Sequence, residues 1–78
     1  MVSIFMEKLL QIINKIRLAK SEPALEALAP ETRLREDIGF DSLDLAELTV
    51  RLEAEFGVDV FDNGSVSTAG EVLAKLEK

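Results

Sequence analysis

The sequence contains no cysteine and no histidine, and these two absences remove many of the side chains on which enzyme active sites are built. Without cysteine there is no disulfide, no thiolate nucleophile and no sulfur-ligated metal site. Without histidine the chain lacks the commonest general base, a common metal ligand and every Ser-His or Cys-His pair. We therefore expect a protein that is not an enzyme and that has no metal site.

Basic residues are also few. Nine Lys and Arg stand against fifteen Asp and Glu, which gives a net charge of −6. Residues 36–71 hold ten of these acids but a single base, Arg51. Nucleic acids and anionic membranes both require a basic surface, so neither is an expected partner. The concentration of acids instead predicts one functional face that meets basic surfaces on other proteins.

Long hydrophobic runs are missing as well. No segment approaches the roughly 20 apolar residues that a membrane span needs, and Glu7 and Lys8 interrupt the apolar start where a signal peptide would be continuous. The 78 residues suffice for one domain, 1–78. We expect a cytoplasmic monomer.

Hydrophobic periodicity predicts three helices. The first covers residues 4–18, the second covers 42–56, and the third begins after Thr68. The apolar positions of the first two recur at intervals of three and four: Phe5, Leu9, Ile12, Ile13 and Ile16, then Leu45, Leu48, Leu52 and Phe56. The chain is therefore expected to be all-α, a small antiparallel three-to-four-helix bundle with a long loop between the first two helices.

Capping residues mark the ends of the second and third helices. Asp41 precedes the second helix, with Asp44 three positions later, and Gly57 follows its last residue. Thr68 and Glu71 have the spacing of a capping box at the start of the third helix.

Residues 19–40 are predicted to be a loop, because Pro23, Pro30 and Gly39 interrupt any regular pattern. Residues 24–28 could form one helical turn within it. A loop of this length is usually functional or held by apolar anchors. The candidates for such anchors are Leu25, Leu28, Leu34 and Ile38. Residues 58–67 are expected to form a second, shorter loop.

Ser42 stands out because Asp41 before it is the expected N-cap. This places Ser42 at the first helical position, where its hydroxyl projects into solvent. A catalytic serine needs an activating base, and no histidine exists. Calcium binding is also disfavoured, because an EF-hand loop counted from Asp37 fails at three ligand or glycine positions.

Four charged residues of the second helix share a side of it: Asp44, Glu47, Arg51 and Glu55. We expect this side to lie roughly opposite Leu48 and Leu52 and to face solvent.

Taken together, these features resemble an acyl carrier protein of the free-standing fatty-acid or polyketide type. The resemblance extends over nearly the whole chain, and it is carried by the size, the acidity, the long first loop and four segments. These are residues 34–44 (LREDIGFDSLD), 46–48 (AEL), 52–58 (LEAEFGV) and 67–70 (STAG).

The resemblance implies that a phosphopantetheinyl transferase attaches 4′-phosphopantetheine from coenzyme A to Ser42, with magnesium, and that the arm carries acyl cargo as thioesters. The absent cysteine then has an explanation, because the cofactor brings the thiol. Acyl-processing enzymes with basic docking patches would meet Asp41, Asp44, Glu47 and Glu53. The acyl chain would withdraw into the bundle. The candidate lining residues are Leu45, Ala46, Val50, Val60 and Val66.

This sequence departs from the family pattern at Phe40, where a small residue is common, and at Arg51 and Ala54, which dilute the acidic face. The segment of residues 61–66 is also shorter than is usual in the family, and Phe61 stands where a proline is frequent. We interpret these departures as signs of a specialised pathway, and we expect Phe40 to pack over the base of the arm. Two alternatives stay open: a peptidyl or aminoacyl carrier protein, and an acidic helical interaction module that is never modified.

Overall fold

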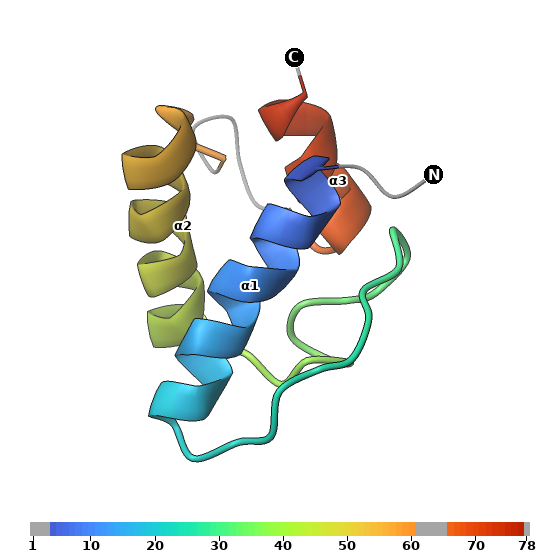
Figure 1. Ribbon diagram of the computed structural model, residues 1–78, viewed down its shortest axis with the longest axis vertical. Coiled ribbons are helices and arrows are strands. Elements are labelled where there is room, and N and C mark those ends of the chain that lie inside the picture. Colours follow the sequence, from blue (N-terminus) through green and yellow to red (C-terminus); the bar gives the residue numbers. More distant parts are fainter. Residues whose placement is uncertain (1–3, 61–65, 78) are drawn as a thin grey trace.

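Three helices make up the regular structure of a computed structural model that describes residues 4–60 and 66–77. They are α1 (Ile4–Ala19), α2 (Ser42–Phe56) and α3 (Ala69–Leu76). α1 packs against both of the others, and α2 and α3 run in the direction opposite to α1 (Figure 1). The predicted all-α bundle with a long first loop is confirmed, and the bounds of α2 coincide with the predicted ones. The second loop was predicted over residues 58–67, and its residues 61–65 lie outside the described residues.

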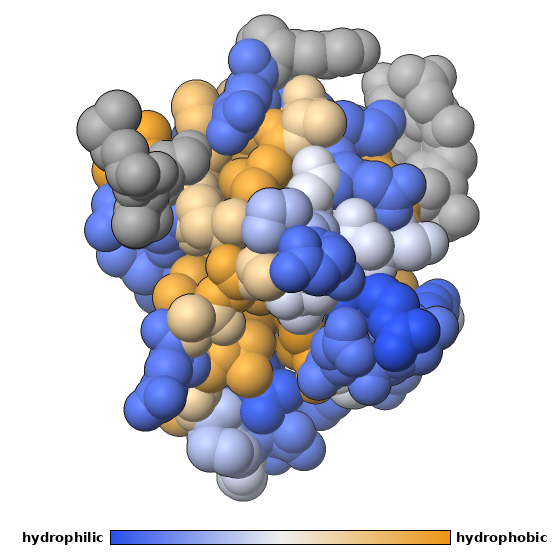
Figure 2. All heavy atoms as spheres, turned by 90° about the vertical axis from the view of Figure 1, so that its right-hand side faces the viewer, coloured by the Kyte–Doolittle hydropathy of each residue, from blue (hydrophilic) through white to orange (hydrophobic). Residues whose placement is uncertain are grey.

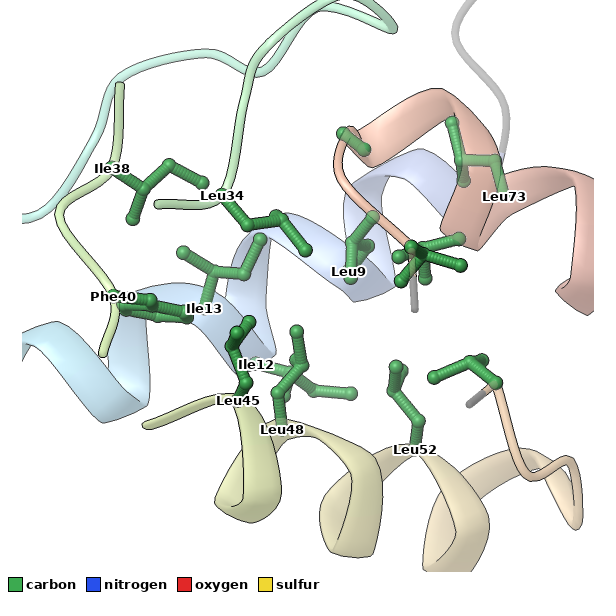
Figure 3. Packing of buried hydrophobic residues seen from close by; sticks show 14 of the residues in the cluster. Leu9, Ile12, Ile13, Leu34, Ile38, Phe40, Leu45, Leu48, Leu52 and Leu73 are labelled. Atoms are coloured by element: carbon green, nitrogen blue, oxygen red, sulfur yellow. The ribbon is translucent and has the colours of Figure 1, made fainter. Parts of the chain in front are cut away.

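One hydrophobic core joins the helices to the loops (Figure 3). α1 contributes the predicted stripe apart from Phe5, and α2 contributes Leu45, Leu48 and Leu52. Phe5 and Phe56 are only half-buried, and their rings lie 5.6 Å apart at the edge of this core. The remaining core members come from α3 and from the loops: Ala69, Val72, Leu73, Leu76, Leu34, Ile38, Phe40, Val60 and Val66.

The predicted capping box of α3 is present, and the predicted N-cap Asp41 forms a second capping box with Asp44 at the start of α2. The Asp41 carboxylate accepts the backbone N–H of Asp44 at 2.9 Å, and the Asp44 carboxylate accepts the N–H of Asp41 at 3.1 Å. Thr68 and Glu71 exchange the equivalent bonds at the start of α3. Gly57 ends α2 with φ +70°, a left-handed conformation that favours glycine. The two capping boxes satisfy N–H groups at the starts of α2 and α3 that have no partner within the helix.

The long loop is held in place by apolar anchors, as predicted. Leu34 and Ile38 are buried, and Leu25 and Leu28 pack against the core from its edge. The side-chain amide of Asn14 also bonds both the N–H and the C=O of Leu25, at 2.7 and 3.0 Å. The helical turn considered for residues 24–28 is absent, and the segment has no regular structure apart from a bend at Glu26.

The same loop is attached to the start of α3. The N–H groups of Ala69 and Gly70 donate to the carbonyls of Thr32 and Pro30 at 2.9 and 2.7 Å, and Leu34 donates to Ser67 at 2.9 Å. A Cβ atom at Gly70 would lie 2.9 Å from the Pro30 carbonyl oxygen, so the close approach requires glycine. The loop is thus an integral part of the fold.

The position of Phe40 differs from the one expected from the sequence. The expected role was to cover the base of an arm on Ser42, but its side chain is 3% exposed and belongs to the core, near Ile13 and Leu45 (Figure 3). A large aromatic ring gains more from burial in the core than from a solvated position beside a helix end. Phe40 therefore anchors the segment that leads into α2.

The described residues contain no helix long and apolar enough to cross a membrane.

Candidate functional site

Ser42 is the first residue of α2, and its side chain is exposed. Asp41 occupies the N-cap position with an extended backbone (φ −97°, ψ −175°), and Phe40 before it is buried. The buried ring and the capping box therefore fix the start of the helix from both sides, while the serine hydroxyl remains accessible. The start of α2 lies at the end of the bundle opposite to the end of α3 (Figure 1).

Arg35 approaches this serine, although sequence analysis did not include it in the site. Its Nη2 atom donates to Ser42 Oγ at 3.3 Å. A compact turn over residues 33–40 makes the approach possible. In this turn the Gly39 N–H donates to the Arg35 carbonyl and the Phe40 N–H donates to the Leu34 carbonyl. Gly39 closes this turn with φ +86°. A residue with a side chain would adopt this left-handed conformation at a cost of about 1–2 kcal/mol.

Asp44 differs from the expectation that it would meet partner proteins. Its side chain is buried, and one carboxylate oxygen accepts a bond of 2.5 Å from Lys20 Nζ at the end of α1. Burial alone would raise the pKa of Asp44, but the bonds from Lys20 and from the Asp41 N–H outweigh it and lower that pKa below its usual range. The bond from Asp44 likewise raises the pKa of Lys20. Asp44 therefore links the site-bearing helix to α1.

We expect Lys20→Met to lower the free energy of unfolding at neutral pH, because it leaves the buried Asp44 carboxylate without its cation. A lowered carboxyl pKa stabilises the fold above the unfolded value of about 3.9, and this contribution is lost as the pH falls through the folded pKa. In Lys20→Met the Asp44 pKa shifts upward, so this contribution is missing at neutral pH, and the deficit in stability relative to the wild type should narrow as the pH falls. Urea unfolding between pH 3 and 7 measures this shift. Coincident pH profiles would contradict the structural role of the pair.

The charged side of α2 was predicted to lie opposite the core, but the structure places it elsewhere. Asp44 and Glu55 are on the flank that faces α1, where Glu55 Oε2 lies 4.0 Å from Lys8 Nζ. Glu47 pairs with Arg51 along the helix at 2.9 Å. The reason is that Asp44, Glu55 and Leu48 are separated by less than a quarter of a turn around a 3.6-residue helix.

Small and apolar side chains occupy the exposed side of α2 instead. Leu43 is 78% exposed and Val50 is 66% exposed, and Ala46 and Ala54 are also exposed. Of the acids expected to recognise partners, Asp41 and Glu53 are exposed and Glu47 is half-buried.

The five candidates for lining an acyl pocket separate into two groups. Leu45, Val60 and Val66 are buried in the core. Ala46 and Val50 lie on the exposed side of α2. A surface hollow between α1 and α2 contains none of the five, since Ile12, Lys15, Arg51, Ala54 and Glu55 line it.

Across residues 4–60 and 66–77, the acids do not gather into a group of three or more that could hold a metal ion. The surface on the side of α3 and the long loop is mixed, with apolar atoms exposed between hydrophilic ones (Figure 2).

The fold and the site thus define a small helical domain that presents a serine hydroxyl at a helix start. The family described as "Phosphopantetheine attachment site" matches residues 7–63, and the chain belongs to this family. It is 44% identical over 50 residues to the acyl carrier protein of Thermotoga maritima, a match that spans 62% of each chain. It is 41% identical over 51 residues to that of Nitratidesulfovibrio vulgaris, across 65% of this chain and 67% of the relative.

The described geometry suits the group that gives this family its name. Residues 7–63 contain two serines, Ser21 and Ser42. Ser21 has a left-handed backbone (φ +64°) in the turn after α1. Ser42 combines an exposed hydroxyl, a helix N-terminus that favours a phosphate group and a guanidinium at hydrogen-bond distance.

Proposed function

We propose that this protein is an acyl carrier protein and that Ser42 is its attachment site for 4′-phosphopantetheine. When bound, the arm supplies the thiol that carries an acyl group as a thioester. The observation that supports this proposal most is the exposed Ser42 hydroxyl at the start of α2, inside the region that matches the family.

Ser42 would act as the acceptor in a group transfer from coenzyme A. Its Oγ forms a bond to the phosphorus that bears the pantetheine, and the pyrophosphate P–O bond of coenzyme A breaks. Adenosine bisphosphate leaves, and the hydroxyl proton passes to the transferase. The chain has no histidine to take this proton, so the transferase and its magnesium must supply the chemistry. The contribution of the chain is to hold an accessible hydroxyl in a fixed place.

Acidic residues at the start of α2 and along it would guide basic partner surfaces to the arm. Asp41 and Glu53 are exposed, and Glu47 is partly exposed beside Arg51. Charges at the rim of an interface raise association rates without requiring a large buried area, which suits a carrier that visits several enzymes. Asp44 would act indirectly, because it is paired with Lys20 and holds the start of α2.

The acyl chain would enter the bundle between α2 and the segments that follow it. Leu45, Val60 and Val66 are the buried members of the candidate set and would line this route. Ala46 and Val50 would instead contact partners, since both are exposed. The proposed cargo is an intermediate of a fatty-acid or polyketide pathway.

A thiol titration tests this function on an unusually clean background, because the chain has no cysteine. We expect no titratable thiol before modification. After incubation with coenzyme A, magnesium and a broad-specificity phosphopantetheinyl transferase, followed by desalting, we expect one thiol per chain. That thiol should then accept an acyl group that neutral hydroxylamine releases. A folded chain that gains no thiol would contradict the proposal and favour an unmodified interaction module.

A further inference from the structure

Arg35 differs from the other three arginines of the chain in its partner. Within residues 4–60 and 66–77, each of the others lies within 4.0 Å of a carboxylate: Arg17 of Glu22, Arg33 of Asp37 and Arg51 of Glu47. No carboxylate of these described residues lies within that distance of Arg35, and the side-chain partner of its guanidinium is Ser42 Oγ. An arginine with free donors at the proposed attachment site can bind an anion there.

The fold holds Arg35 in this place although its side chain is exposed. Leu34 before it is fully buried, and its N–H and C=O are bonded to Ser67 and Phe40 at 2.9 and 3.0 Å. The Arg35 carbonyl accepts the Gly39 N–H at 3.1 Å. Because the backbone on both sides is fixed, the Cα atom of Arg35 is held at a place from which the guanidinium reaches Ser42.

The N-cap acid Asp41 and the first-turn acid Asp44 of α2 are already engaged. Asp44 is paired with Lys20, and the Asp41 carboxylate accepts the Asp44 N–H. These contacts reduce the repulsion that an anion would meet at the head of the helix. The contact of 3.3 Å is long for an N–H···O bond, so Ser42 does not saturate the guanidinium.

We propose that Arg35 is a positioning residue that holds the phosphodiester of the phosphopantetheine arm against the start of α2. This inference rests on the proposed function. The diester carries a negative charge, and a guanidinium offers planar paired donors that suit its oxygens. Since the diester is attached to the adjacent Ser42, pairing requires no further association step, and even a weak contact is populated. Arg35 thereby fixes the direction in which the arm leaves the protein.

The test compares apo and modified protein in wild type and in Arg35→Gln. Attachment of the arm should lower the equilibrium constant for unfolding of the wild type by about two- to fivefold, the range expected of an exposed charge-assisted contact. This stabilisation by the arm should disappear in Arg35→Gln. The phosphorus-31 resonance of the modified protein should also shift between wild type and Arg35→Gln. Intact mass verifies full modification of each sample.

Arg33→Gln is the matched control, because it removes the same charge two residues away from an arginine that pairs with Asp37. It should keep both the stabilisation by the arm and the wild-type phosphorus resonance. Arg35→Lys keeps the charge without the paired donors and should retain only part of the stabilisation. It also serves as the test variant if the transferase does not modify Arg35→Gln.

Several results would overturn the inference. One is a modified Arg35→Gln chain that retains the full stabilisation and the wild-type phosphorus resonance. Another is an equal loss in Arg33→Gln, which would show that only the net charge of the loop matters. A wild-type chain that gains no arm by mass would overturn the proposed function, and with it this role of Arg35. Intact mass therefore distinguishes failure of the function from failure of the inference.

Discussion

Ser42→Ala should abolish the gain of the phosphopantetheine arm completely, while the protein remains folded. The hydroxyl oxygen is the atom that would bond to phosphorus, and no neighbouring side chain can replace it. The fold should tolerate the change, because the Ser42 side chain is exposed and the capping box is formed by Asp41 and Asp44. A surface substitution of this kind changes stability by about 0.5 kcal/mol or less. Intact mass and urea unfolding measure the two effects.

Ser67→Ala is a suitable control for this variant. Ser67 is also exposed, and its backbone makes the bonds to Leu34 and Glu71. It should be modified like the wild type. Modification of a folded Ser42→Ala chain would assign the arm to another residue.

Phe40→Ala should lower the free energy of unfolding by about 3–5 kcal/mol, the usual cost of removing a buried aromatic side chain. The ring is 3% exposed and packs in the core directly before the N-cap of α2. A domain of this length has a total stability of about 4–12 kcal/mol, so the variant should lose from about a quarter to all of it. Urea unfolding followed by circular dichroism gives the difference.

Phe40→Leu keeps most of the apolar volume and should cost much less, about 1.5 kcal/mol or below. This second variant stays measurable if Phe40→Ala does not fold. A loss below about 1 kcal/mol in Phe40→Ala would contradict the core position. It would return Phe40 to the role expected from the sequence, a cover over the base of the arm.

Local patterns explain why so much of the fold could be predicted. The interval of three and four residues identified α1 and α2, and capping chemistry identified the starts of α2 and α3. Both signals depend on neighbours within one or two turns, so a sequence displays them directly. The presented hydroxyl of Ser42 follows from the same logic, because its place depends on the neighbouring cap residues Asp41 and Asp44.

The remaining parts of the site depend on contacts between distant segments. Lys20 and Asp44 are separated by 24 positions, and only the packing of α1 against α2 brings them together. Arg35 reaches Ser42 through a turn whose conformation depends on Gly39 and on burial of Leu34. The hydrophobic periodicity of a sequence does not indicate such contacts. For the same reason, Asp44 was expected to be a recognition residue although the structure buries it.

Phe40 illustrates a different limit. Its sequence neighbours are Gly39 and Asp41, which indicate a turn and a cap, and its side chain was expected beside the arm instead of in the core. The side chain lies in the core near Ile13 and Leu45 (Figure 3), and it follows a turn of residues 33–40 that backbone hydrogen bonds hold together. A signal did exist, since a large aromatic residue next to a helix start seldom remains exposed without a partner.

The central claim is that Ser42 carries the arm, and locating the modification by mass tests it most directly. The wild-type chain would be incubated with coenzyme A, magnesium and a broad-specificity transferase, weighed intact and then fragmented. The account predicts a gain of one phosphopantetheine, located on Ser42. No gain on a folded chain, or a gain located on another residue, would contradict it.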